Sequence, residues 1–199
     1  MQHHNPLIND HPEKKFITMG EIMLRLTPPN YQKIRMANEF EATYGGSEAN
    51  IALALANLGI DSTFFTVVPN NSIGKSAIRM LRSNDVHCTP VILSTPEETP
   101  THRLGTYYLE KGHGLRSSVV VYDRAHSTFC ESEFADYDWN EIFEDAQALY
   151  VTGITPALSD SLFEATLEAV KCASKKGISV YYDVNYRAAL LSMDKAARI

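Results

Sequence analysis

Residues 44–59 read Tyr-Gly-Gly-Ser-Glu-Ala-Asn-Ile-Ala-Leu-Ala-Leu-Ala-Asn-Leu-Gly, a glycine pair that runs directly into an alanine-rich helical pattern. Two adjacent glycines let the backbone approach a ligand closely. The first turn of the helix adds unpaired N–H groups and the positive end of the helix dipole. This segment therefore predicts a cradle for a polar, anionic or hydroxyl-rich small molecule, on a helix that ends at Gly59.

The segments on either side of this helix alternate between strand and helix patterns. Residues 16–20 predict a first strand, and residues 22–26 its continuation after this glycine. Further along, the pattern predicts strands over 62–68, 148–151 and 178–184, and helices over 72–83, 159–177 and from 188 onward. The helix over 47–58 is apolar almost all round, which predicts burial. The helix over 72–83 has one apolar face, formed by Ile73, Ala77, Met80 and Leu81. This alternation predicts an α/β fold with parallel strands.

A different pattern occupies residues 90–124. Strands are expected over 91–93, 101–110 and 117–122, with a hairpin turn at 111–114 and no helix between them. Residues 31–43 lack a helical period and predict further short strands. Together these stretches predict a small antiparallel sheet standing apart from the parallel one, with Val119, Val120 and Val121 as an exposed edge.

The composition is that of an ordinary globular protein of one domain, with 44% hydrophobic and 21% charged residues among 199. A formal net charge of −6 disfavours nucleic acid or an anionic membrane surface as the main partner. There is no apolar run long enough for a transmembrane helix. Residues 1–14 are expected to form a disordered polar tail, and residues 15–199 the domain. Three cysteines far apart in the sequence favour a reducing cytoplasm. The scattered histidines show no metal-ligand spacing, so no metal site within the chain is predicted.

Four stretches resemble the ribokinase-like (PfkB) family of carbohydrate kinases. They are residues 45–50 (Gly-Gly-Ser-Glu-Ala-Asn), 105–108 with 121–125, 153–159 (Gly-Ile-Thr-Pro-Ala-Leu-Ser) and 183–187 (Asp-Val-Asn-Tyr-Arg). The last two are similar to the branch of the family that acts on 2-keto-3-deoxygluconate. The chain departs from the family pattern at residues 69–74, where only Gly74 of the usual glycine turn is kept.

The resemblance implies a ribokinase-like parallel sheet flanked by helices, with the antiparallel strands from about 31–43 and 90–124 acting as a lid over a sugar. The substrate-binding residues that it implies are Gly45, Gly46, Asn50, Tyr107, Tyr122, Arg124 and Arg187. Tyr122 and Arg124 are two apart on a strand, so they share a face, where the ring would cover the carbon skeleton and the guanidinium would pair with a carboxylate. Either Tyr107 or Tyr108 faces the sugar, depending on the strand register, and Tyr107 is preferred.

The resemblance also implies ATP with Mg²⁺, and a nucleotide bordered by Asn185, Tyr186 and Arg187. Asp183 is expected to orient that loop. The family's catalytic aspartate follows a glycine motif near the C-terminus, and no such motif occurs up to Ile199. No catalytic residue is therefore assigned within the chain, and the chain is expected to be an N-terminal portion of the fold.

The implied activity is ATP-dependent phosphorylation of 2-keto-3-deoxygluconate to its 6-phosphate. Two alternatives stay open: another sugar kinase of the family, such as a fructokinase, or a truncated sugar-binding chain without catalysis. The family often dimerises through its lid sheet, so a homo-oligomer is expected if the fold is complete.

Overall fold

The computed structural model describes residues 15–88, 91–133 and 137–187, and the expected tail over 1–14 and the helix from 188 lie outside this range. Its strands and helices follow one another along the chain as β1 (Lys15–Met19), β2 (Met23–Thr27), η1 (Pro29–Tyr31), η2 (Ile34–Met36), β3 (Glu41–Gly45), α1 (Ser47–Asn57), β4 (Ser62–Phe65), β5 (Val67–Pro69), α2 (Ser72–Arg82), β6 (Ile92–Ser94), β7 (Thr106–Glu110), β8 (Val119–Asp123), α3 (Thr128–Glu131), α4 (Trp139–Ile142), β9 (Ala146–Thr152), α5 (Thr155–Leu158), α6 (Asp160–Lys175) and β10 (Ser179–Asp183).

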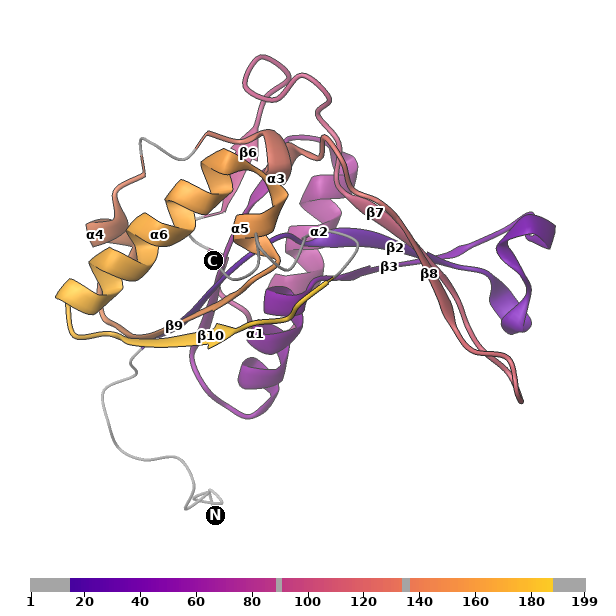
Figure 1. The fold of residues 1–199 in the computed structure, drawn as a ribbon, viewed down its shortest axis with the longest axis horizontal. Helices are drawn as coiled ribbons and strands as arrows, with labels where there is room; N and C mark the ends of the chain where they lie inside the picture. Colours follow the sequence, from indigo (N-terminus) through magenta and orange to yellow (C-terminus); the bar gives the residue numbers. More distant parts are fainter. Residues whose placement is uncertain (1–14, 89–90, 134–136, 188–199) are drawn as a thin grey trace.

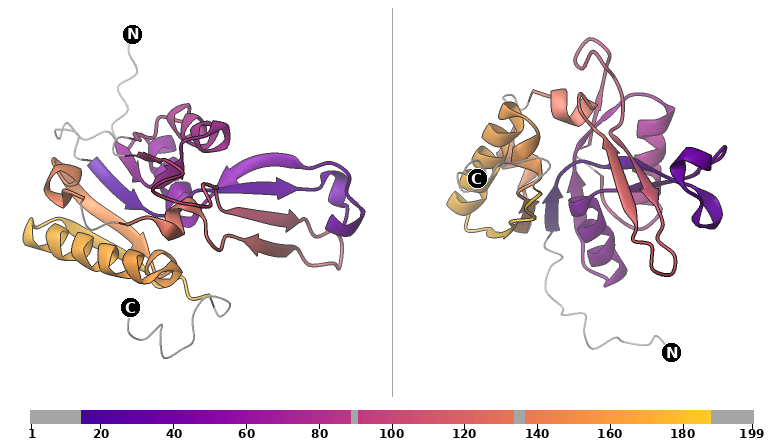
Figure 2. Two further views of the ribbon diagram at one scale, coloured as in Figure 1. Left: turned by 90° about the horizontal axis from the view of Figure 1, so that it is seen from above. Right: turned by 45° about the vertical axis from the view of Figure 1, so that its right-hand side comes forward.

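The body of the molecule is a parallel sheet between two layers of helices. Its strands lie in the order β10-β9-β1-β4, and all three pairs are parallel. Figure 2 shows α6 on one side of this sheet and α1 with α2 on the other. The expected α/β fold with a parallel sheet and flanking helices is therefore confirmed.

Strand periodicity builds one hydrophobic core on each face of this sheet. In β4, the ring of Phe64 joins the core beneath α1 and α2, whereas that of Phe65 joins the core beneath α6. Ile17 and Met19 of β1 point to the α6 side. Because neighbouring side chains of a strand point to opposite faces, a strand buried on both sides has few polar positions.

A second sheet projects from the body as a long arm (Figure 1). Its order is β3-β2-β7-β8, and residues of these four strands form what we call the lid. The lid differs from the expected antiparallel sheet because β2 and β7 are parallel, although β2–β3 and β7–β8 are antiparallel. The turn after β7 occupies the expected place, with Gly114 at φ 58°.

Some expected strands were placed wrongly. The strand expected over 62–68 is divided between β4 of the parallel sheet and β5, which pairs with β6. Residues 22–26 do not continue the first strand, because the chain leaves the parallel sheet at Gly20 and β2 becomes a central lid strand. Residues 91–93 do not join the lid, because β6 pairs parallel with β5 across the α2 crossover. Residues 29–31 and 34–36 form short 3₁₀ turns in place of strands, so β3 is the strand of that region.

The sequence predicted the ends of the helices better than it predicted which of their residues are buried. Side-chain oxygens cap α2 and α6 at Asn71 and Ser159, and Gly59 and Gly177 follow α1 and α6 with positive φ. In α1, however, burial is limited to Glu48, Ala49 and Ala52, so the expected burial all round is wrong. In α2, Ile78 is buried, whereas the expected Ile73 is 47% exposed.

Candidate functional site

A cavity of about 240 Å³ lies where the lid meets the body. Its lining comes from the connection between β1 and β2, the start of α1, the lid with the residue after β8, the connection between β9 and α5, and the loop after β10. The lining residues are Glu21, Met23, Gly46, Ser47, Glu48, Asn50, Tyr107, Val120, Tyr122, Arg124, Ile154 and Arg187. Six of the seven residues expected to bind substrate are in this set, and Gly45 lies beside it.

The glycine pair fits tightly between the body and the lid. At Gly46 the backbone is extended, with φ −171°, and a Cβ atom there would collide with the carbonyl oxygen of Glu21. A Cβ atom at Gly45 would lie 2.7 Å from the hydroxyl oxygen of Tyr107. Close packing therefore requires glycine at Gly46, whereas at Gly45 only the end of the Tyr107 side chain would have to shift. Without a side chain at Gly46, the start of α1 has no side-chain cap and borders the cavity.

The lid contributes a tyrosine pair to the cavity. Tyr107 of β7 and Tyr122 of β8 are direct cross-strand neighbours, and their ring centroids are 5.8 Å apart. Tyr108 points away and packs edge-on against Phe40. Of the two tyrosines that the sequence left open, Tyr107 lines the cavity. Because Tyr122 is 53% exposed, its ring presents an apolar face to whatever occupies the space.

Arg124 has a partner that the sequence analysis missed. Its Nε donates to Oε2 of Glu21 at 2.9 Å, and its Nη2 pairs with the same oxygen. The hydroxyl of Ser127 donates to Oε1 of Glu21 at 2.6 Å. Glu21 is only 4% exposed and stands between Gly20 and Ile22 at the crossing from β1 to β2. A glutamate inside an otherwise buried strand pattern was the signal available, since a buried charge needs a partner.

Glu48 is a second buried carboxyl group beside the cavity. Its Oε1 accepts hydrogen bonds from the hydroxyls of Thr152 at 2.6 Å and Thr155 at 3.1 Å. Burial raises the pKa of Glu48 above its ordinary value, although the two threonine hydrogen bonds and the charge of Arg124 oppose this. The group ties the first turn of α1 to the end of β9 and the start of α5.

The loop after β10 brings Arg187 to the cavity and anchors itself to α1. The carboxylate of Asp183 accepts a hydrogen bond from the backbone N–H of Asn185 at 2.9 Å, in keeping with its expected orienting role. The side-chain amide of Asn185 donates to the hydroxyl of Ser47 at 2.9 Å. Neither Asn185 nor Tyr186 is among the residues that line the cavity. Their assignment to a nucleotide stays a prediction.

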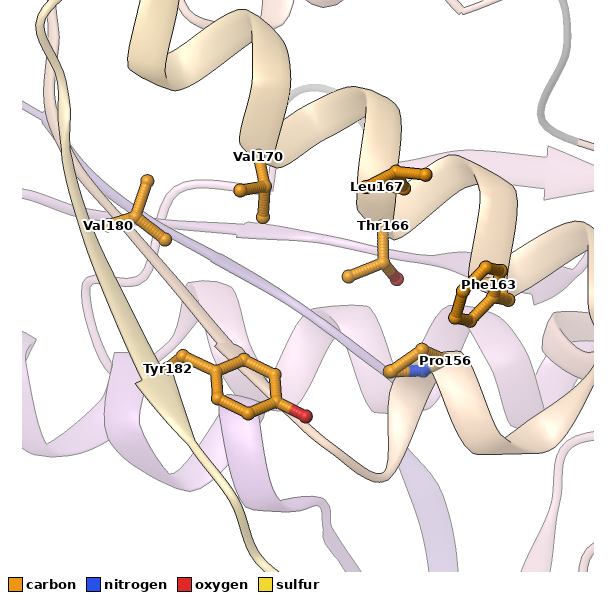
Figure 3. Close-up of a pocket in the computed structure, with 7 residues that line it drawn as sticks. All are labelled: Pro156, Phe163, Thr166, Leu167, Val170, Val180 and Tyr182. Carbon is orange, nitrogen blue, oxygen red and sulfur yellow. The ribbon is translucent and has the colours of Figure 1, made fainter. Parts of the chain in front are cut away.

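A different groove, of about 230 Å³, runs between α6 and β10. Figure 3 shows its lining of mostly apolar side chains, which are Pro156, Phe163, Thr166, Leu167, Val170, Val180 and Tyr182. The hydroxyl of Thr166 already donates to the carbonyl of Leu162. This groove offers no charged group, so it suits a sugar acid far less than the cavity under the lid.

Within 15–88, 91–133 and 137–187, no three histidine, cysteine or acidic side chains are grouped so as to hold a metal ion. Over the same residues, no helix is both long and apolar enough to cross a membrane.

Comparison with known proteins places these features in a family. The 2-dehydro-3-deoxygalactonokinase of Haloferax volcanii is 35% identical over 182 residues, which are 92% of this chain and 55% of that protein. The 2-dehydro-3-deoxygluconokinase of Bacillus subtilis is 29% identical over 174 residues, covering 87% of this chain and 52% of its own length. The chain therefore spans about half the length of the curated relatives that it matches.

A solved structure and a family model agree with these relatives. The crystal structure of 2-dehydro-3-deoxygluconokinase from Thermotoga maritima superposes with a TM-score of 0.88 at 41% identity, over 94% of this chain and 55% of that one. The model of pfkB family carbohydrate kinases matches residues 13–199. The chain belongs to the pfkB family of carbohydrate kinases, as its four motif stretches predicted.

Proposed function

We propose that this chain provides the sugar-acid half of a kinase site that phosphorylates 2-keto-3-deoxygluconate at its terminal hydroxyl, giving the 6-phosphate. The observation that supports this most is the single cavity that brings Asn50, the Tyr107–Tyr122 pair, Arg124 and Arg187 together. An amide suits sugar hydroxyls, aromatic rings suit the C–H face of a sugar, and guanidinium groups suit a carboxylate.

In this proposal each group positions the substrate. Gly45 and Gly46 bring the backbone close to the sugar, and Asn50 binds its hydroxyls from the exposed side of α1. The tyrosine pair covers the carbon chain, while Arg124 and Arg187 meet the carboxylate. Phosphoryl transfer depends mainly on such positioning and on charge around the phosphate. The base that accepts the hydroxyl proton is assigned to the part of the relatives' length that this chain does not span.

The phosphate donor in this proposal is ATP, bordered by Asn185, Tyr186 and Arg187. The exposed guanidinium of Arg187 reaches the cavity and could meet both a carboxylate and a transferring phosphate. Since the described residues hold no metal-binding cluster, Mg²⁺ is proposed to enter with the phosphates of ATP. The division into a tail over 1–14 and one partial domain over 15–199, and a cytoplasmic location, are parts of the same proposal.

Three alternatives compete with this assignment. The Haloferax volcanii relative is named for the galactonate form of the sugar acid, so this C4 epimer is the nearest competitor. A fructokinase-like enzyme would prefer a neutral sugar. A chain that binds the sugar acid but has no kinase activity of its own would show binding without ATP turnover.

Calorimetric titration separates the first two alternatives from the proposal, and an assay of ATP turnover tests the third. We expect 2-keto-3-deoxygluconate to bind more tightly than its C4 epimer or fructose. Asn50→Ala and Arg187→Gln should each weaken binding about tenfold, the loss of one good polar contact. Arg116→Gln, at the tip of the lid, is the matched control and should bind normally. Equal binding of fructose, or normal binding by Arg187→Gln, would contradict the sugar-acid assignment.

A further inference from the structure

The ion pair between Glu21 and Arg124 occupies one edge of the guanidinium group. Both Nε and Nη2 of Arg124 donate to Oε2 of Glu21, and Ser127 occupies the other carboxylate oxygen. The arginine side chain is 10% exposed and that of Glu21 is 3% exposed. A pair so enclosed is held far more firmly than a surface salt bridge, whose partners move freely in water.

The opposite side of the guanidinium carries Nη1, which takes no part in the pair with Glu21. Among the residues that the structure describes, Nη1 of Arg124 has no hydrogen-bond partner. Arg124 lines the cavity, and its Cζ lies 6.0 Å from the centre of the Tyr122 ring. A guanidinium group is planar with fixed N–H directions, so fixing its Nε–Nη2 edge also fixes the direction of Nη1.

We infer that Glu21 is a positioning residue that sets the cavity's preference for a carboxylate, by holding Arg124 with its Nη1 side turned toward the ligand. This inference rests on the proposed function. Glu21 lines the cavity as well, yet both its oxygens already accept hydrogen bonds from the protein. Its effect on an anionic ligand therefore passes through Arg124.

The charge of Glu21 would have the opposite effect on the affinity for the acid. Glu21 also carries a negative charge, which partly cancels that of Arg124 and repels a carboxylate. If this repulsion dominated, removing the charge would tighten binding of the acid. We expect orientation to dominate, because a released arginine must lose its rotamer freedom again when the ligand binds.

The test compares two ligands that differ in one group. The probes are 2-keto-3-deoxygluconate and 3-deoxyfructose, which has a neutral CH₂OH in place of the carboxylate. Titrations followed by NMR give both dissociation constants for the full chain. Glu21→Gln should weaken binding of the acid by about three- to tenfold and leave the neutral sugar within about twofold of wild type. Asp123→Asn, which removes the charge from the nearby Arg103–Asp123 pair outside the cavity, should change neither dissociation constant.

A second variant covers the case in which Glu21→Gln does not fold. Ser127→Ala removes the other hydrogen bond to Glu21 but keeps the charge of Glu21. It should weaken binding of the sugar acid alone, by a smaller factor than Glu21→Gln does. Unchanged or tighter binding of the acid, or an equal loss of affinity for both ligands, would overturn the inference. A wild-type chain that binds the two ligands equally would instead overturn the sugar-acid assignment itself, so the two failures are distinguishable.

Discussion

Gly46 lies where two backbones pass at contact distance. Its extended φ of −171° is open to any residue, so its glycine is required by space and not by conformation. A side chain there would push the start of α1 away from the carbonyl of Glu21, and with it the polar rim of the cavity. Gly59 is the opposite case, with φ 77° and open space around its missing Cβ.

This contrast gives a matched pair of variants. Gly59→Ala should destabilise the protein by about 1 kcal/mol through backbone strain alone and leave ligand binding intact. Gly46→Ala should destabilise it by about 1–3 kcal/mol through overpacking and also weaken binding of the sugar acid. Urea denaturation and titration measure the two effects. Normal ligand binding by Gly46→Ala would show that this glycine does not shape the cavity.

The buried carboxyl of Glu48 predicts a pH dependence of stability. Its pKa in the folded state lies above the ordinary 4.5. Below pH 4.5 the group is protonated in both states, whereas above it the unfolded state ionises first. The stability contributed by Glu48 is therefore full at low pH and falls as pH rises toward the raised pKa, by up to about 1.4 kcal/mol per pH unit.

Replacing Glu48 by glutamine removes this dependence while keeping an oxygen for the two threonine hydroxyls. The stability of Glu48→Gln relative to wild type should rise as pH rises above 4.5, as measured by urea denaturation at several pH values between 4.5 and 7. Glu164→Gln, an exposed position on α6, controls for the same chemical change. A constant difference across this range would contradict a raised pKa for Glu48.

At the level of elements, local signals predicted where helices begin and end. Ser159 and Gly177 mark the ends of α6 in the sequence as they do in the structure, because caps and positive-φ turns depend on neighbouring residues only. Strand partners depend on distant chain segments. Nothing within residues 22–26 or 91–93 shows that β2 enters the lid or that β6 pairs with β5. Those two errors follow from this limit.

The cap of α6 can be tested by itself. The hydroxyl of Ser159 accepts a hydrogen bond from the backbone N–H of Leu162 at 3.2 Å. Ser159→Ala should lower the free energy of unfolding by about 1 kcal/mol, because this N–H loses its partner. Ser174→Ala, on the exposed side of the same helix, should have little effect. Thermal or urea denaturation compares the two variants. Equal stability of both would show that the hydrogen bond of Ser159 does not stabilise α6.

At the level of the whole molecule, the cavity exists because two sheets meet. It joins residues as far apart in sequence as Glu21 and Arg187. The motif residues Asn50, Tyr122 and Arg124 could be predicted because each stands in a recognisable stretch. Glu21 and Glu48 could not be assigned, because their roles depend on Arg124, Thr152 and Thr155 arriving from other elements.

The lid edge offers a prediction about assembly. We propose that the exposed strand β8 pairs with a second copy of the lid; Val119 and Val121 are 47% and 48% exposed on it. Val121→Glu should then lower the mass seen by analytical ultracentrifugation to that of a monomer. Val184→Glu is the control, since Val184 is the same residue type and is 64% exposed but lies after β10. A wild-type monomer, or the same shift with the control, would contradict assembly through the lid.

The central claim is that the cavity between the body and the lid binds a sugar acid. Its most direct test is a ¹H–¹⁵N NMR titration of the chain with 2-keto-3-deoxygluconate. We expect saturable shifts of the amide signals of Gly46, Asn50, Tyr122 and Arg124, with residues 163–170 of α6 unaffected. Shifts confined to the groove between α6 and β10, or no shifts at all, would contradict it.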